Sequence, residues 1–189
     1  MNELGDMIPI PCANPDEIPR VYAAKHQDDY TVFFRYDLAP HLRSSLAALP
    51  PKVLFMDHPR IKSILSQFAP CKELWVGKSY VFPEMLRPTL YPDVVYLPEQ
   101  RKWVVVINEQ IVSSCSSARE NNIAGEAWTF TQPSFRRRGY GRQVTAAWAQ
   151  ALREKGKIPF YSHLKDNAAS ARIARSLGLI QFIEVVAYS

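Results

Sequence analysis

The sequence predicts an α/β (α+β) protein: a mixed, mostly antiparallel central sheet flanked by helices. From residue 101 onward, strand-like and helix-like segments follow the order β-β-β-α-β-α-β, a pattern typical of a sheet covered by helices. The chain has 189 residues, enough for one domain or one domain with an extension. Its composition, 47% hydrophobic and 22% charged, is that of an ordinary globular protein. No apolar run reaches the length of a membrane span, so no membrane partner is expected.

The first hundred residues contain most of the 15 prolines and predict short elements. Residues 30–36 are rich in β-branched and aromatic side chains and predict a strand. Residues 39–49 have helical spacing and end at a pair of prolines. A second helix is expected over 58–68, with Asp57 as its N-cap. The stretch "KELWVGKSYVFPE" predicts a strand or a bent hairpin, and a proline-rich connection follows it.

The last ninety residues are more regular, because apolar runs are separated there by clear turn signals. The first two predicted strands flank "NEQ" and form a hairpin. The long helix has an apolar face that includes Val144 and Trp148, and Gly156 ends it. The later helix begins near Asn167 or Asp166 and ends at Gly178. The predicted strands are 102–108, 111–118, 126–131, 158–164 and 179–188, and the helices are 142–156 and 167–178.

The three cysteines, Cys12, Cys71 and Cys115, are odd in number and lie far apart. No cysteine or histidine spacing indicates a metal site, so no metal is expected. Together with an acidic, proline-broken start that does not resemble a signal peptide, this predicts a cytoplasmic protein with reduced thiols. Cys115 in "SSCSS" could be a nucleophile, but a small strand residue is favoured because no neighbour in the sequence would activate it.

Positive charge gathers in the last third of the chain. Residues 132–189 hold 10 Lys and Arg against 3 Asp and Glu, a net charge of +7, whereas residues 1–131 carry −2. The densest run is "RRRGYGR", residues 136–142, between the end of a predicted strand and the start of the long helix. A helix start offers unpaired backbone N–H groups, and glycines let a phosphate approach them. We therefore interpret this run as an anion-binding loop.

Two common phosphate loops do not fit the run. The dinucleotide-binding fingerprint needs a further glycine where Val144 stands, and the P-loop ending of Gly-Lys-Ser/Thr is absent. The spacing that does fit is Arg-x-x-Gly-x-Gly at Arg136, Gly139 and Gly141, preceded by Pro133. This resembles the acyl-coenzyme A loop of the GNAT N-acetyltransferase superfamily. The segment "YSHLKDNAASARIARSLGL" resembles that family's second signature, and the resemblance covers about residues 101–180.

The resemblance implies acetyl-coenzyme A (acetyl-CoA) as the acyl donor. The strand at 126–131 would offer backbone groups to the pantetheine arm, and the loop would hold the pyrophosphate. Asn167 and Ser170 would reach the arm from the second helix, although Asn167 could serve only as a helix cap and Ser170 could be only an exposed first-turn residue. The expected cofactor-binding residues are Phe130, Thr131, Arg136, Arg137, Arg138, Gly139, Tyr140, Gly141, Arg142, Asn167 and Ser170.

The resemblance also implies direct attack of an amine on the acetyl thioester, which requires a group that removes a proton. Glu126, at the start of the fourth family strand, is one candidate base, or else a surface carboxylate. His163 is another, since imidazole titrates near neutrality, although it could be only a hydrogen-bonded histidine. Many family members carry a tyrosine acid where this chain has Ala174. Tyr161 or Tyr188 could replace it, or the thiolate could leave unassisted.

We expect residues 101–189 to form the acetyl-CoA-binding core and residues 1–100 to form an additional α/β segment on the substrate side. The acceptor is expected to be an amine on a small molecule or a protein, and a homodimer is possible. One alternative is a non-catalytic acyl-CoA sensor. Another is a nucleic-acid-binding module that uses the basic run, but no RRM, KH or helix-turn-helix signature supports it, so no nucleic-acid partner is expected.

Overall fold

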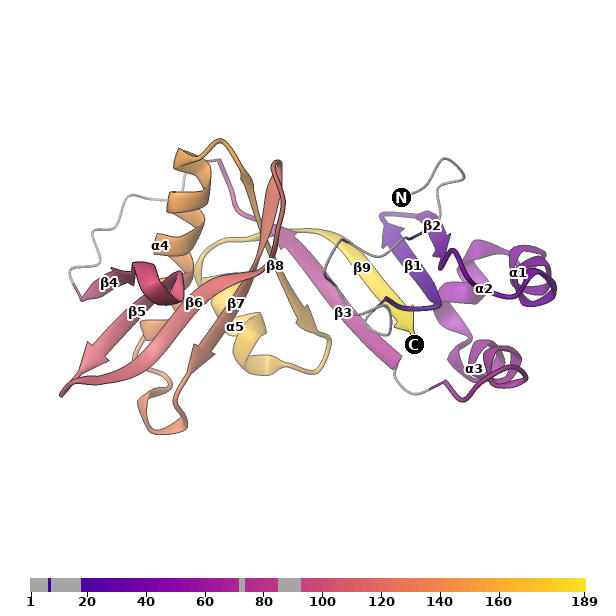
Figure 1. Ribbon diagram of the computed structural model, residues 1–189, viewed down its shortest axis with the longest axis horizontal. Helices are drawn as coiled ribbons and strands as arrows, with labels where there is room; N and C mark the ends of the chain where they lie inside the picture. The colour runs from indigo at the N-terminus through magenta and orange to yellow at the C-terminus, as the bar shows by residue number, and fades with distance from the viewer. Residues whose placement is uncertain (1–6, 8–17, 72–73, 85–92) are drawn as a thin grey trace. The chain divides into compact units, whose positions relative to one another are not determined.

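A computed structural model describes residues 7, 18–71, 74–84 and 93–189 (Figure 1). Cys12 therefore lies outside the described residues. The chain forms two compact units, Met1–Lys78 with Phe182–Ser189, and Ser79–Gln181. These limits differ from the division expected at residue 100, because the end of strand β3 (Leu74–Val81) belongs to the second unit. Most of the final strand β9 (Ile180–Tyr188) belongs to the first unit, where it pairs with an N-terminal strand.

The first unit contains a small antiparallel sheet covered by short helices. Strand β1 pairs antiparallel with β2 on one side and with β9 on the other. Buried leucines and isoleucines from all three helices form its core with Val21 and Val186. Asp57 accepts a hydrogen bond from the backbone of Arg60 and caps the third helix, as expected. The elements are β1 (Val21–His26), β2 (Asp29–Phe34), α1 (Pro40–Ala47), α2 (Pro51–Met56) and α3 (His58–Ser66).

Two elements of the first unit were not predicted, strand β1 and helix α2. The sequence "VYAAKH" of β1 lacks a clear alternation, because only its last residue is exposed. The paired prolines that end α1 also begin α2, with Pro51 in its first turn, where the missing N–H group costs nothing. The same proline pair thus ends α1 and begins α2.

The second unit contains a mixed sheet in which neighbouring strands follow the order β8-β7-β6-β5-β4, with β3 beside β8. The pairs from β4 to β7 are antiparallel, and β7 and β8 are parallel. The observed order of elements from residue 101 confirms the prediction. The elements are β4 (Val94–Leu97), β5 (Lys102–Ile107), β6 (Gln110–Glu120), β7 (Ala124–Thr131), α4 (Tyr140–Glu154), β8 (Ile158–Leu164) and α5 (Ala168–Ser176).

The sheet of the second unit has two unlike faces. Helix α4 packs against β5, β6, β7 and β8. A Cβ atom on Gly125 would lie 2.9 Å from Leu152 Cδ1, and Thr129 Oγ1 lies 2.8 Å from Thr145 Oγ1 of α4. These residues of β7 lie on what we call the helix face. Because side chains alternate along a strand, Glu126, Trp128 and Phe130 lie on the opposite side, which we call the open face.

Candidate active site

Strands β7 and β8 pair at one end and separate at the other. Their parallel ladder joins Ala124 to Ile158 and ends at Glu126 and Phe160. Strand β7 continues to Thr131 and β8 to Leu164, and Figure 1 shows the two ribbons diverging. On its other edge, β7 stays paired with β6 as far as Thr131. The backbone of β7 beyond Glu126 is therefore available on the side that faces β8.

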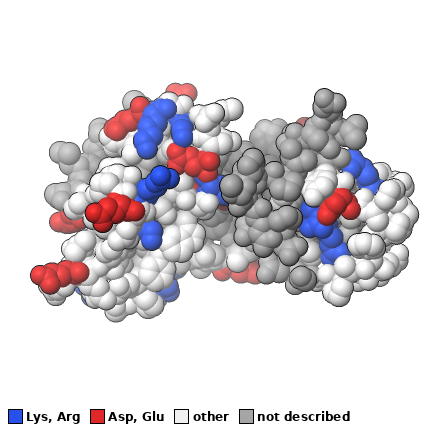
Figure 2. Space-filling model, viewed as in Figure 1, with Lys and Arg blue, Asp and Glu red and all other residues white. Residues whose placement is uncertain are grey.

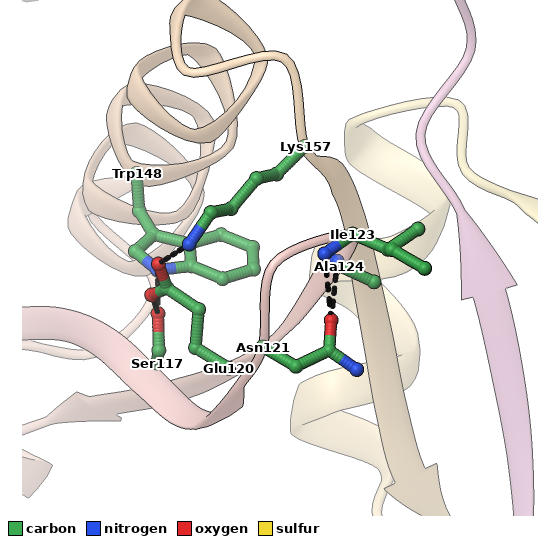
Figure 3. A network of polar contacts seen from close by, with 7 residues as sticks. All are labelled: Ser117, Glu120, Asn121, Ile123, Ala124, Trp148 and Lys157. Carbon is green, nitrogen blue, oxygen red and sulfur yellow. Dashed lines mark hydrogen bonds and ion pairs between the residues drawn. The ribbon is translucent and has the colours of Figure 1, made fainter.

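A polar network holds the closed end of this pair of strands (Figure 3). Lys157, just before β8, lies with its Nζ 2.6 Å from Glu120 Oε1 at the end of β6. Ser117 donates to the other carboxylate oxygen of Glu120 and accepts a hydrogen bond from Trp148 Nε1 of α4. The hydrogen bond from Lys157, followed by that from Ser117, holds the pKa of Glu120 below its ordinary value. Glu120 therefore acts as a fixed anion that joins two strands and a helix.

The turn between β6 and β7 is also fixed by hydrogen bonds. Asn121 Oδ1 accepts from the backbone N–H groups of Ile123 and Ala124, each at 2.8 Å. The backbone N–H of Ile158 donates to Ile123 O at 2.8 Å, which continues the contact into β8. These hydrogen bonds join the turn before β7 to the start of β8.

The basic run lies at the open end, between β7 and α4. After a short 3-10 turn at Pro133–Phe135, the chain reaches Gly139, which is the N-cap of α4. Gly139 has φ +84° and supplies no side chain for capping, so the backbone N–H groups of the first turn of α4 remain available. Arg137 also has a positive φ, +63°. This backbone path agrees with the anion loop that the sequence predicts.

Glycine is needed at Gly141 for a different physical reason than at Gly139. A Cβ atom there would lie 3.1 Å from Thr131 Oγ1 and 3.1 Å from Ile173 Cδ1. The absence of a side chain thus lets α4 approach both β7 and α5 closely. Nothing lies nearer than 4.0 Å to a Cβ built on Gly139, where the nearest atom belongs to Gln143. Gly139 is required by its backbone conformation and Gly141 by packing.

The four arginines of the run have unlike environments. Arg136 Nε donates to the backbone carbonyl of Thr131 at 3.1 Å, which ties the loop to the end of β7. The guanidinium of Arg138 lies over the ring of Phe135, 5.3 Å from its centroid. Arg137 and Arg142 are exposed. Arg136 therefore ties the loop to β7 and Arg138 lies against Phe135, while Arg137 and Arg142 are exposed and can meet an anion in solution.

The expected contacts from α5 already have partners within the protein. Asn167 Oδ1 accepts a hydrogen bond from the backbone N–H of Ser170 at 3.0 Å, so Asn167 is the N-cap of α5. The side chain of Ser170 forms a hydrogen bond with Tyr161. A role for either residue in cofactor binding stays a prediction.

Tyr161 and His163 point to the helix face and are buried, at 2% and 5% exposure. Burial raises the pKa of Tyr161 to about 12, so its hydroxyl keeps its proton at neutral pH. His163 Nδ1 lies 2.8 Å from the carbonyl oxygen of Leu164, so Nδ1 carries the proton that is donated. Its Nε2 is then an acceptor and has no hydrogen-bond partner among the described residues. The ring stacks on Tyr80, with centroids 5.3 Å apart.

Glu126 lies on the open face, in the last residue pair before the strands separate. Glu126 forms a long ion pair: its Oε2 lies 3.9 Å from Arg119 Nε, and the Arg119 side chain is 78% exposed. An exposed pair of this kind contributes little to stability. The carboxylate is thus accessible and only loosely engaged.

Sequence reasoning missed Gln143, whose buried Oε1 has no hydrogen-bond partner among the described residues. It lies one turn into α4, beside Gly139. It also missed Trp128 and expected only backbone contacts from Phe130, whose ring forms an exposed pair with that of Trp128. No signal in the sequence marked Gln143, because it does not belong to the buried stripe of α4. The position of the two aromatic residues on one face with Glu126 could have been recognised, because the three residues alternate along the predicted strand.

A pocket of about 660 Å³ lies near the other end of α4 and is lined by Trp103, Trp148 and Lys155, among others. It contains none of the predicted site residues. Because a helix rises about 1.5 Å per residue, Lys155 lies roughly 20 Å along the helix axis from the loop. Cys115 lies under α4, fully buried, and burial raises its pKa to about 12. This confirms the interpretation of Cys115 as a strand residue, since a buried neutral thiol is a poor nucleophile.

Surface charge on the face shown in Figure 2 does not gather into a patch of one sign; basic and acidic side chains alternate there. The described residues contain no group of three or more His, Cys, Asp or Glu that could hold a metal ion. None of the described helices is long and apolar enough to cross a bilayer.

Comparisons with known proteins point to one fold. Residues 125–186, from β7 to β9, match the family model "FR47-like protein". No curated protein sequence matches the chain. A structure from Novosphingobium aromaticivorans, described as a GNAT-family acetyltransferase, has a TM-score of 0.54 at 14% identity. That match covers 62% of this chain and 65% of that protein, so it leaves out about a third of the relative.

Two further structures agree. A GNAT-family acetyltransferase from Colwellia psychrerythraea has a TM-score of 0.55 at 9% identity and covers 84% of this chain and 75% of that one. A GCN5-related N-acetyltransferase-like protein from Streptococcus suis has a TM-score of 0.52 at 13% identity and covers 90% and 84%. With the separating parallel strands and the glycine-capped helix α4, these matches establish that the chain has the GNAT-superfamily N-acetyltransferase fold.

Proposed function

We propose that this protein is an N-acyltransferase that moves an acetyl group from acetyl-CoA to a primary amine in a ternary complex. The observation that carries the proposal is the position of the Gly139-capped start of α4 at the open end of the β7–β8 pair. A strand edge and a set of free helix N–H groups lie together there. This pairing suits a long ligand with an amide-containing arm and a pyrophosphate.

The residues at the site fit such a ligand. The first-turn N–H groups of α4 and the exposed guanidiniums of Arg137 and Arg142 would hold the pyrophosphate. Gln143, with its unpartnered buried Oε1, would accept a hydrogen bond from the ligand. The backbone of Phe130 would pair with the arm. Acetyl-CoA supplies the acetyl group as a reactive thioester.

Removal of the amine proton and protonation of the sulfur would take place on opposite faces of the sheet. The amine nitrogen bonds to the acetyl carbon as the carbon–sulfur bond breaks, so the amine loses a proton and the sulfur gains one. Glu126 on the open face would accept the amine proton, directly or through water. Tyr161 on the helix face would provide the proton for the sulfur; its hydroxyl is protonated at neutral pH, although its raised pKa makes it a weaker acid than an ordinary tyrosine. His163, with a free Nε2, is a second candidate for proton transfer on the helix face.

A non-catalytic acyl-CoA sensor is the second candidate, and one observation favours it. Ala174, where a tyrosine acid stands in many GNAT enzymes, is 2% exposed and packs in the core. Its methyl group fills the space without offering a proton. If Tyr161 cannot supply that proton, the protein would bind the acyl donor without transferring its acetyl group.

Calorimetric titration tests the proposal first. Acetyl-CoA, coenzyme A and a short single-stranded oligonucleotide are titrated separately into the protein. We expect micromolar binding of the first two and none of the oligonucleotide; the reverse result would exclude both acyl-CoA proposals. Detection of free thiol across a panel of amines then separates an enzyme, which releases coenzyme A only with an amine present, from a sensor, which releases none.

A further inference from the structure

Two large aromatic side chains stand exposed on the open face beside Glu126. Trp128 is 51% exposed and Phe130 is 44% exposed. Their rings are nearly parallel, at 11°, with centroids 6.3 Å apart. Exposed aromatic side chains on a sheet are costly to leave in water, and this pair is already ordered by mutual stacking.

The position of the pair connects it to the transfer chemistry. Glu126, Trp128 and Phe130 alternate along β7, so all three project from the same face. The parallel register places Phe160 beside Glu126 on that face. Across the antiparallel pair, Ser116 and Ser114 lie opposite Trp128 and Phe130, so small polar residues border the rings. A carboxylate and a flat aromatic surface thus meet where β7 and β8 begin to separate.

Both features attract the same kind of group. A carboxylate attracts an ammonium by charge, and the face of an indole ring attracts it through the ring quadrupole. A ring or flat apolar group on the same ligand would stack on the aromatic pair and leave water. The proposed pyrophosphate site at the start of α4 and the candidate acid Tyr161 both lie on the helix face, so the open face is left for the acceptor.

We propose that Glu126, Trp128 and Phe130 form the acceptor site, and that the acceptor is a primary amine carried on a short chain next to an aromatic or flat apolar group. This inference rests on the proposed N-acyltransferase function, whose substrate class it defines. Glu126 binds the ammonium form and then takes its proton, and the two rings select the substituent.

Three matched probes test the site by direct calorimetric binding to the full-length protein in the presence of coenzyme A. Phenethylamine has both the ammonium and the ring, 2-phenylethanol lacks the charge, and propylamine lacks the ring. We expect phenethylamine to bind at least about tenfold more tightly than either, since cation–π and stacking contributions each reach about 1 kcal/mol or more. Equal affinity for phenethylamine and propylamine would overturn the role of the rings.

Single substitutions test whether phenethylamine binds at Trp128 and Phe130. Trp128→Leu and Phe130→Leu should each weaken phenethylamine about 5- to 30-fold and weaken propylamine less, because propylamine has the ammonium but no ring to stack. Phe68→Leu is the matched control, because Phe68 is also exposed, at 67%, but belongs to the first unit. Unchanged phenethylamine affinity in Trp128→Leu would overturn the proposal. So would a dimer that dissociates in the same variant, measured by sedimentation, since the rings would then serve an interface between copies.

Different results would overturn the N-acyltransferase function and the acceptor site. If the protein binds acetyl-CoA and acetylates amines without preferring phenethylamine, the acceptor site is wrong and the N-acyltransferase function stands. If phenethylamine binds at Trp128 but neither acetyl-CoA nor coenzyme A binds, the function is wrong and the amine site stands. Initial rates provide a second readout, because loss of ring contacts should raise KM for phenethylamine more than it lowers kcat.

Discussion

The side chains of Glu126 and Tyr161 project from opposite faces of the sheet that β7 and β8 form. Glu126 pairs with Phe160 in the parallel ladder, and Tyr161, the next residue of β8, faces α4 and α5 with the buried core. The loosely paired carboxylate of Glu126 and the buried phenol of Tyr161 thus lie on opposite sides of one sheet. This geometry suits a reaction that removes a proton on one side and supplies one on the other.

Glu126→Gln tests the base. It keeps the size of the side chain but removes its capacity to accept a proton, so we expect kcat for amine acetylation to fall about 10²- to 10⁴-fold with acetyl-CoA affinity unchanged. Glu120→Gln is the matched control six residues earlier. It breaks the contact with Lys157, so it should lower the melting temperature and leave kcat close to the wild-type value. Full activity in Glu126→Gln would remove Glu126 from the mechanism.

Tyr161→Phe tests the acid. The ring that fills the core stays, and only the hydroxyl that bonds to Ser170 is lost, so stability should change by no more than about 1 kcal/mol. We expect kcat to fall while calorimetric acetyl-CoA affinity holds. His163→Gln, assayed in parallel, decides between the two helix-face candidates: the variant with the larger loss of kcat identifies the donor. If neither variant loses activity, the sulfur leaves without a protein acid.

The sequence predicted the second unit well because its elements are long and regular. The apolar face of α4 and the turn signals around β5 and β6 were visible as periodic patterns. The loop at Arg136–Arg142 could be found because glycine at a helix start has a local physical reason. In the first unit, short elements such as α2 gave too few residues to show a period. The boundary between units was also hidden, because β9 returns to pair with β1 from the far end of the chain.

The faces of the sheet explain what the sequence could not show about the site. Glu126, Tyr161 and His163 were predicted together, but only the parallel register of β7 and β8 shows that Glu126 lies apart from the other two. The internal partners of Asn167 and Ser170 are equally invisible in a sequence, since a helix cap and a ligand contact use the same residue type.

Gly139→Val tests the anion loop against a control with the same backbone strain. Gly139 has φ +84° and Gly178, at the end of α5, has φ +65°, and neither would bring a new Cβ atom closer than 4.0 Å to another side chain. Both valines should destabilise the fold, by about 1–2 kcal/mol or somewhat more for a β-branched residue. Only Gly139→Val should lose coenzyme A binding, because its side chain would stand among the free N–H groups of α4. Equal coenzyme A affinity in the two variants would show that the loop assignment is wrong.

Stability at alkaline pH depends on three buried groups whose pKa burial raises, Cys115, Tyr161 and Tyr188, of which the first two begin to titrate at the lowest pH. Burial raises the pKa of Cys115 from 9.0 to about 12 and that of Tyr161 from 10.0 to about 12. In both cases the folded protein holds a proton that the unfolded chain releases. The stabilisation is therefore complete below about pH 9 and is lost as the pH rises from there towards 12.

Each such group changes the free energy of unfolding by up to about 1.4 kcal/mol per pH unit inside its window. In urea unfolding at pH 8, 9, 10 and 11, the urea concentration at the midpoint should change little at the lowest pH values and then fall as the pH rises. Tyr161→Phe removes one of the groups and should reduce the fall between pH 10 and 11, while the two proteins lose the same stability between pH 8 and 9. Identical slopes for the wild type and Tyr161→Phe above pH 10 would mean that Tyr161 titrates in the folded protein as it does in the unfolded chain.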